Sequence, residues 1–450
     1  MRWLALLLVL AAMAFAGGAA AQPFRGGAVS ELEIVFPPPG IALAPEDAGD
    51  PAAGDLATDA LVWAKTIRSP VSQGTEAPAQ VRLRLSAIAL PPGDGFRIEI
   101  ADLRGRVYDT LDRPLLEGGG PVWTLGVPGT AASLRVRGGD AVEGLRFTID
   151  RIAFPFDGKA LESVFGQNDL MDIKDYTGIH LAAVQGVETS VARIDFVTAL
   201  GGDVCTGFRI GADLVQTSSH CIADGVTCAT ASILFGYKKN AFNGIERGQQ
   251  VRCVEVVAVD GAAGADTALL RVSPVPEAGY AVAALRGDDP VGDEPLFMVE
   301  HPGGEPKKLS IIDCHRLDTA LTAQSADTFG HTCDTKGGAS GAPIFDVAGL
   351  VVGQHRAGHD NPDITDQPNI ATKGSRLVLA GGDPPAEPAM GIEPDPDQPP
   401  PGEAPIGTAR PLPLPTAPPD VGRGTDVQAD QGPSVSSPGS SGGGLPDTEN

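Results

Sequence analysis

Short runs in which apolar and polar residues alternate recur through the first third of this chain. The alternation is clearest over residues 81–87, 96–100 and 145–149, and breaks rich in glycine and proline separate the runs. A period of two places successive side chains on opposite faces of a β-strand, and strands spaced by roughly 10–15 residues are typical of a β-sandwich. The sequence therefore predicts an antiparallel β-sandwich over residues 22–160.

The composition of the whole chain supports a β-rich fold and excludes some classes of partner. There are 33 basic and 57 acidic residues, a net charge of −24, so nucleic acid phosphates and anionic membrane surfaces would be repelled. Aromatic residues make up only 5%, while glycine (58) and proline (40) are abundant. This composition argues against helical arrays and favours an all-β protein with turns and some disorder.

The first 21 residues have the pattern of a secretory signal peptide. Arg2 precedes an apolar run over residues 3–15, and small residues follow, ending in three alanines at 19–21. A membrane anchor is the alternative, but the run is shorter than the ~20 residues that a span needs. We therefore expect a secreted or periplasmic protein that starts near Gln22 and has no membrane span.

The last 70 residues differ from the rest of the chain. Residues 381–450 contain 17 prolines and 12 glycines and almost no large apolar side chains. Such a segment cannot bury enough surface to offset the entropy lost on ordering. We predict a disordered acidic tail here.

Six cysteines are confined to the middle of the chain: Cys205, Cys221, Cys228, Cys253, Cys314 and Cys333. An even number in an exported protein predicts disulfides, although six cysteines allow 15 pairings and spacing alone cannot choose among them. Zinc is the alternative, but no C-x-x-C pattern occurs. We expect three disulfides and no metal site.

Three separated segments carry the residue types that peptide hydrolysis by a serine requires. They are Thr-Ser-Ser-His-Cys at 217–221, Asp-Thr-Ala-Leu-Leu at 266–270 and Gly-Gly-Ala-Ser-Gly-Ala-Pro at 337–343. This chemistry needs a nucleophile, a base, a carboxylate that orients the base, and donors for the oxyanion. The glycines around Ser340 permit a sharp turn in which the amides of Gly338 and Ser340 point to one place.

Each of these segments has an ordinary explanation when it is taken alone. A G-x-S-G sequence is often a turn, a histidine beside a cysteine is often structural, and an aspartate before an apolar run often starts a strand. The order His220, Asp266, Ser340, each in its local context, makes coincidence a poor explanation. Asp260 is a weaker candidate than Asp266 because no comparable apolar run follows it.

Together the three segments resemble the trypsin/chymotrypsin-like serine peptidases, in which they read T-A-A-H-C, D-I-A-L-L and G-D-S-G-G-P. The resemblance spans about residues 190–375. It implies a domain over residues 165–380 with two six-stranded β-barrels and an active site between them. A looser resemblance, to the accessory sandwiches of some secreted bacterial peptidases, would make Trp63 and Trp123 core residues and leaves that domain's role open.

The resemblance also bears on disulfide pairing. Cys205 and Cys221 match the family's disulfide beside the catalytic histidine, and closing a loop of ~15 residues stabilises by about 3 kcal/mol in the chain-entropy model. Cys314 with Cys333 is a second candidate pair, and Cys228 with Cys253 follows by elimination.

One departure from the digestive members of the family is informative. They have an aspartate immediately before the serine, which pairs with the new N-terminal amine after activation, whereas this chain has Ala339. That ion pair is therefore excluded here. Ala339 makes the chain more similar to bacterial members, including the glutamyl endopeptidases.

Two readings of substrate preference remain open. Glutamyl endopeptidases recognise an acidic P1 residue with a threonine five before the serine and a histidine fifteen after it, and this chain has Thr335 and His355 there. Arg356 could add positive charge. His355 is alternatively a strand residue without this role. Asp334, six before Ser340, would instead favour Lys or Arg.

We therefore expect a secreted serine endopeptidase that acts as a monomer on protein or peptide substrates. Ser340 would attack the carbonyl, His220 would act as base and then acid, and Asp266 would orient His220. The alternative is an inactive peptidase fold that binds a surface or polymer through the sandwich. His301, His355 and His359 lack the H-E-x-x-H pattern of a zinc helix, and we expect no cofactor.

Overall fold

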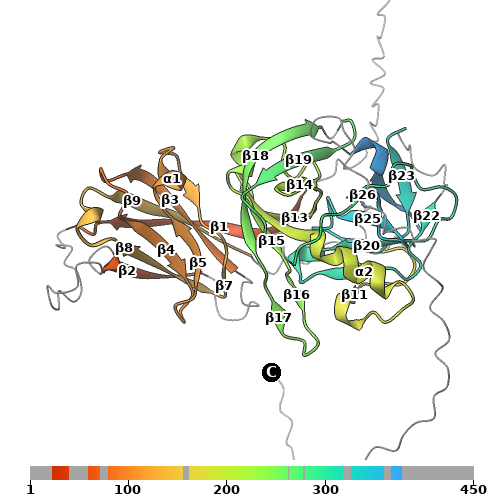
Figure 1. Ribbon diagram of the computed structural model, residues 1–450, viewed down its shortest axis with the longest axis horizontal. Helices are drawn as coiled ribbons and strands as arrows, with labels where there is room; N and C mark the ends of the chain where they lie inside the picture. The colour runs from red at the N-terminus through yellow and green to blue at the C-terminus, as the bar shows by residue number, and fades with distance from the viewer. Residues whose placement is uncertain are drawn as a thin grey trace, which may run out of the picture. The chain divides into compact units, whose positions relative to one another are not determined.

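The computed structural model describes residues 23–39, 59–70, 80–155, 162–261, 263–276, 279–317, 326–358 and 366–377. The strands and helices named below are labelled in Figure 1 where space allows. The predicted signal peptide and the predicted tail both lie outside these described residues.

The predicted β-sandwich consists of two sheets that share one core. One sheet contains β1 (Phe24–Phe36), β9 (Arg146–Pro155), β3 (Gln80–Ala89), β6 (Val122–Trp123) and β7 (Val127–Pro128). The other contains β2 (Leu61–Arg68), β8 (Ala131–Arg137), β4 (Arg97–Ala101) and β5 (Val107–Leu111). The apolar side chains of the alternating runs meet in this core and are shielded from water: Val81, Leu83, Leu85, Ile98, Ile100, Phe147 and Ile149.

The two tryptophans occupy different places. Trp63 is half-buried at the edge of the sandwich core, where its ring lies 5.3 Å from that of Phe36. Trp123 instead packs with Val197 of the neighbouring barrel. Only Trp63 therefore contacts the sandwich core, and Trp123 belongs to the junction with the barrel.

The first barrel is a closed ring of six antiparallel strands. Its order is β12 (Val191–Thr198), β15 (Ser232–Phe235), β18 (Gln250–Asp260), β19 (Thr267–Val272), β14 (Leu214–Thr217) and β13 (Gly201–Arg209), and β13 pairs back with β12. The hairpin of β16 (Lys238–Lys239) and β17 (Ile245–Glu246) extends from it. Nearly every residue of β12 is buried, because Ile194 and Phe196 lie in the barrel core while Arg193 is covered by η5, to which it donates a hydrogen bond.

A second antiparallel sheet follows along the chain. Its order is β11 (Met171–Asp172), β21 (Lys308–Ser310), β20 (Leu296–Glu300), β25 (Pro343–Asp346), β26 (Val351–Ala357), β27 (Asn369–Lys373), β23 (Thr328–His331) and β22 (Arg316–Leu317). A bridge between Pro295 and His315 connects the β22 end back to β20. Six strands of this sheet thus form the second ring that the resemblance implies.

Short elements complete the fold. A two-stranded sheet pairs β10 (Glu162–Ser163) with β24 (Thr335–Lys336). The helices are α1 (Arg113–Leu116), α2 (Leu181–Val187) and α3 (Gly225–Cys228), with 3₁₀ turns η2 (Gly139–Val142), η3 (Ile173–Asp175), η4 (Glu188–Ser190), η5 (Pro302–Gly304) and η6 (Gly374–Arg376). In the described part of the chain, none of the helices has the length and apolarity to cross a membrane.

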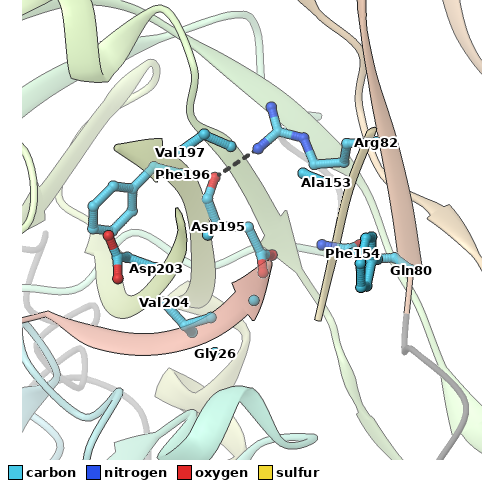
Figure 2. Close-up of a pocket in the computed structure, with 12 residues that line it drawn as sticks. Gly26, Gln80, Arg82, Ala153, Phe154, Asp195, Phe196, Val197, Asp203 and Val204 are labelled. Atoms are coloured by element: carbon cyan, nitrogen blue, oxygen red, sulfur yellow. Dashed lines mark hydrogen bonds between the residues drawn. The ribbon is translucent and has the colours of Figure 1, made fainter. Parts of the chain in front are cut away.

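β1 joins the sandwich to the first barrel, because it pairs with β9 along one edge and with β13 along the other. Arg82 of β3 also crosses this junction and donates to the carbonyl oxygens of Asp195 (3.2 Å) and Thr230 (2.5 Å). Figure 2 shows this contact beside a cavity of about 30 Å³. That volume holds roughly one water molecule, so this cavity is no candidate for a peptide site.

Three disulfides link the cysteines of the two barrels: Cys205–Cys221, Cys228–Cys253 and Cys314–Cys333. None of the six cysteines is free. The first disulfide connects β13 to the segment that follows β14, and the residue before Cys221 is His220. It therefore anchors the backbone that carries the imidazole.

Candidate active site

Asp266 immediately precedes β19 and has a left-handed backbone, with φ of +57°. Aspartate is one of the few non-glycine residues that tolerate this region. Its carboxylate is inaccessible to solvent and accepts three hydrogen bonds, from Ser219 Oγ (2.7 Å), the amide of His220 (3.0 Å) and His220 Nδ1 (2.7 Å). Burial alone would raise the pKa of Asp266, but the bonds from His220 and Ser219 outweigh it and lower this pKa below its usual value.

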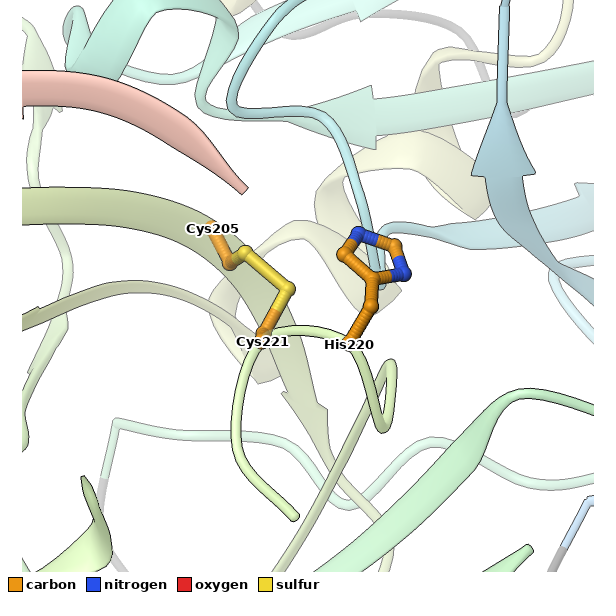
Figure 3. A group of neighbouring side chains, drawn as sticks. All are labelled: Cys205, His220 and Cys221. Atoms are coloured by element: carbon orange, nitrogen blue, oxygen red, sulfur yellow. A yellow bond between two sulfur atoms is a disulfide. The ribbon is translucent and has the colours of Figure 1, made fainter. Parts of the chain in front are cut away.

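His220 lies between the end of β14 and the Cys205–Cys221 disulfide, as Figure 3 shows. Because an ionised carboxylate can only accept hydrogen bonds, Nδ1 of His220 carries the proton in this contact, and a neutral ring then has none on Nε2. Nε2 is buried and has no hydrogen-bond partner among the described residues. The imidazole is therefore held in the tautomer that can accept a proton.

The loop around Ser340 depends on two glycines. Gly338 has φ of +100°, and the amide of Ala339 donates to the carbonyl of Lys336 (3.0 Å), so Gly338 is the third residue of a turn that requires a positive φ. A Cβ at Gly338 would lie 2.9 Å from the carbonyl of His301, and one at Gly341 would overlap the carbonyl of Thr206. Larger residues cannot fit at either position.

This loop also lies beside the segment that leads to His220. A Cβ at Gly341 would lie 3.0 Å from the amide of Ser218, two residues before His220. The amide of Thr206 donates to the carbonyl of Ser340 (2.9 Å). No hydrogen bond between Ser340 and His220 occurs within the described residues, and such bonds often form only once substrate is bound.

The turn η5 supports the loop that carries Ser340. The sequence H-P-G-G at 301–304 forms this turn, and the amide of Gly303 donates to the carbonyl of Gly337 (2.6 Å). Arg193 of the first barrel, 1% exposed, donates to the carbonyl of Gly304 (2.6 Å). Within the described chain, the amides of Gly338 and Ser340 donate no hydrogen bond, which leaves both free to bind an oxyanion.

The two residues expected to contact an acidic P1 residue lie on strands beside this loop. Thr335 is the first residue of β24 and is 1% exposed. His355 lies in β26, where its amide donates to the carbonyl of Ala342 (2.8 Å) and its carbonyl accepts from Gly341 (2.9 Å). His355 is thus held directly against the loop that carries Ser340.

His331 is a neighbour of His355 that the sequence did not single out. Its Nε2 lies 3.1 Å from Nδ1 of His355, and both rings are buried. Burial lowers the pKa of His331 well below its usual value, and burial together with His220 lowers the pKa of His355 to about 3. Both imidazoles are therefore neutral near pH 7. No motif in the sequence marked His331.

Arg356, which could add positive charge at an acidic P1 site, lies beside Asp266. Its Nε lies 3.6 Å from Oδ2 of Asp266, and Nη1 donates to the carbonyl of Gly264 (3.0 Å). This guanidinium therefore brings a positive charge close to the carboxylate that bonds to His220.

Asp334 forms hydrogen bonds with the segment that connects the sandwich to the barrels. Its carboxylate accepts from the amides of Phe165 (2.9 Å) and Asp169 (2.7 Å), and it is 3% exposed. Burial raises the pKa of Asp334 to about 6. Both oxygens already have donors, which argues against a role in binding a lysine or arginine side chain.

Glu300, at the end of β20, is another buried residue that no sequence motif singled out. It is fully buried, and neither carboxylate oxygen has a partner in the described structure. Burial, and then repulsion from Asp334, raise the pKa of Glu300 well above its usual value.

The candidate metal ligands have other partners. The ligand atoms of Cys205, His220 and Cys221 lie close together, but the two sulfurs form a disulfide and cannot bind a metal as thiolates. Nδ1 of His301 lies 3.0 Å from the carbonyl of Glu305. His359 lies outside the described residues.

Comparisons with known proteins agree with this geometry. Residues 205–353 match the family model of the trypsin-like peptidase domain. Among curated proteins, uncharacterized protein y4fB of Sinorhizobium fredii is 27% identical over 227 residues, which cover 45% of this chain and 32% of that protein. Secreted RxLR effector protein 73 of Plasmopara viticola is 23% identical over 248 residues, covering 52% of this chain and 59% of that protein.

The chain thus spans less than two thirds of both relatives. Among solved structures, the active form of the Rv3671c protease from M. tuberculosis aligns with a TM-score of 0.31 and 20% identity, over 42% of this chain and 78% of that one. The segment that matches the trypsin-like peptidase domain, residues 205–353, contains His220, Asp266 and Ser340 and most strands of the closed six-stranded barrel.

Proposed function

We propose that this protein is an exported serine endopeptidase. The single observation that carries the proposal is the 2.7 Å bond from His220 Nδ1 to Asp266, which leaves Nε2 as an unpartnered acceptor. The glycine-rich loop of Ser340 lies next to the segment that holds this ring. A base, its orienting carboxylate, a serine and two free amides are what acyl transfer requires.

The residues act in two half-reactions. As Ser340 Oγ bonds to the carbonyl carbon of the substrate, its proton passes to His220 Nε2, and the amides of Gly338 and Ser340 bind the oxyanion. His220 then donates that proton to the leaving amine as the peptide bond breaks, which leaves an acyl ester on Ser340. Water attacks the ester carbonyl and gives a proton to His220 Nε2. As the bond to Ser340 Oγ breaks, His220 returns that proton to Oγ, which releases the acid and restores the serine.

Covalent labelling tests this assignment directly. A small alkyl fluorophosphonate is expected to phosphonylate Ser340, with loss of fluoride, because this serine has the proposed base and oxyanion donors beside it. Peptide mass mapping should find the adduct on Ser340, and prior acid unfolding should prevent it. An unlabelled Ser340 in folded protein would favour the alternative, a peptidase fold that only binds a surface or polymer.

We further propose that P1 is acidic. His355 is neutral, and in the tautomer in which its Nδ1 accepts from His331 Nε2–H, its own Nε2–H can donate to a carboxylate together with the hydroxyl of Thr335. Asp334 is already bonded to two amides and does not oppose an acidic side chain as a free pocket carboxylate would.

A chromogenic panel with Glu, Lys or Phe at P1 tests the preference. We expect kcat/KM to be highest for Glu, and Thr335→Val to lower it by about tenfold for Glu with little change for Phe, since one hydrogen bond to a charged group contributes about 1.5–3 kcal/mol. Thr332→Val, a nearby buried threonine that bonds to Asp313 and His315, is the matched control. A preference for Lys would overturn the proposal.

A further inference from the structure

The segment that leaves the sandwich lies where the proposed P1 side chain would bind. β10 pairs with β24 in antiparallel register, with Ser163 opposite Thr335 and Glu162 opposite Lys336. The hydroxyl of Thr335 donates to the carbonyl of Ser163 (3.4 Å). The group proposed to contact a substrate carboxylate is therefore already engaged by this chain.

Ser163 is enclosed on its other sides as well. Nδ2 of Asn369 donates to its carbonyl (3.0 Å), and its own hydroxyl donates to Oδ1 of Asn369. Asn369 begins β27, the strand that pairs with the one carrying His355. Ser163 is 2% exposed and the next residue, Val164, is 6% exposed. This degree of burial is that of a core segment.

Gly358 locates Ser163 with respect to β26. It follows the last residue of β26, three positions after His355, and a Cβ built on it would overlap the side chain of Ser163. Ser163 therefore fills the space between β24, which carries Thr335, and the end of the strand that carries His355.

Two further contacts fix the region ahead of Ser340. The carboxylate of Asp334 accepts from the amides of Phe165 and Asp169, which holds the chain after Ser163 in place. At the other end of the sandwich, Phe24 of β1 packs on Gly337, where a Cβ would lie 2.9 Å from its ring. The chain thus contacts the 334–337 segment both where it enters the sandwich and where it leaves it.

We propose that β10 is an intramolecular occupant of the P1 subsite, so that the intact chain is latent toward extended substrates until residues 162–169 leave β24. This inference rests on the proposed function, because Thr335 and His355 locate the subsite. A P1 side chain and Ser163 exclude each other, whereas a small reagent without a P1 group needs only Ser340 and His220. The apparent affinity for substrate is proportional to the fraction of molecules in which the segment is displaced, so it is low when that fraction is small.

Two phosphonate reagents, tested on the secreted protein, distinguish a reaction that needs the P1 subsite from one that needs only Ser340 and His220. A small alkyl fluorophosphonate should label the wild type readily, while a peptidyl diphenyl phosphonate with Glu at P1 should react slowly. Ser163→Trp cannot fit against Gly358 and should accelerate the peptidyl reagent by at least about tenfold, with little change for the small one. Ser163→Ala, which still fits, is the matched control and should resemble the wild type.

The outcomes are distinct. Equal acceleration of both reagents, or none by Ser163→Trp, would overturn latency while leaving the peptidase assignment intact; absence of labelling in every variant would overturn the assignment itself. Hydrogen exchange covers the case in which Ser163→Trp does not fold. In wild-type protein reacted to completion with the peptidyl reagent, amides 163–169 should exchange faster than in the unreacted protein, and unchanged protection there would refute the displacement.

Discussion

Ser340→Ala is expected to reduce peptide hydrolysis by roughly 10⁴- to 10⁶-fold, because loss of the nucleophile in a serine triad removes the whole covalent pathway. The Ser340 side chain makes no hydrogen bond among the described residues, and removing one oxygen leaves no cavity of consequence. Folding should therefore be unaffected, with circular dichroism and melting temperature close to wild type. Hydrolysis of a chromogenic peptide, compared with and without Ser340→Ala in protein that also carries Ser163→Trp, measures the loss.

A matched serine controls for the substitution itself. Ser375 is exposed, and its hydroxyl bonds to Asp289 on the surface. Ser375→Ala should retain full activity and full labelling by the fluorophosphonate. If Ser340→Ala hydrolysed peptide at the wild-type rate, the nucleophile would be misassigned.

The second large effect is expected for Asp266→Asn, with a loss of about 10⁴-fold in kcat. Asparagine has the same shape and also tolerates a positive φ, so the backbone at +57° is not strained. Its amide, however, has one acceptor where the carboxylate has two. If the NH₂ group faces His220, Nδ1 must accept from it and the imidazole proton moves to Nε2. If the NH₂ group faces the other way, it opposes the donors on Ser219 and the His220 backbone.

Asp260 provides the control for this prediction, because it was the other candidate carboxylate in the sequence. It ends β18, and among the described residues no hydrogen bond joins it to His220, whose Nδ1 is occupied by Asp266. Asp260→Asn should change kcat by no more than about twofold, as expected of a residue outside the triad. Steady-state kinetics of the two variants measure both losses. If Asp260 were the orienting acid, Asp260→Asn would show the larger loss of kcat.

Several features of the fold could be predicted because they depend on a few neighbouring residues. The alternation over residues 81–87 and 96–100 indicated strands, since side-chain direction in a strand has a period of two. The glycines at 338 and 341 indicated a special turn, since both have a positive φ that other residues adopt at a cost. The fold class was confirmed on this basis, with the closed barrel as its clearest element.

Other features could not be predicted, because they join residues far apart in the chain. The alternation over residues 81–87 placed Arg82 on the polar face of its strand. It is nevertheless only 4% exposed, because a barrel strand more than a hundred residues away covers it. Asp334 could have been a pocket carboxylate, and its bonds to Phe165 and Asp169 decided otherwise. His331 gained its neighbour only through the pairing of β23, β26 and β27.

The amino-acid sequence by itself determined which groups are available for chemistry: an imidazole, a carboxylate and a hydroxyl in contexts that hold each backbone in the required local conformation. Only the tertiary structure decided which partners these groups have, that Arg356 acts on Asp266 and that Ser163 fills the space beside Thr335. The physical reason is that backbone preference is set within a few residues, whereas burial and hydrogen-bond partners depend on how distant strands pack.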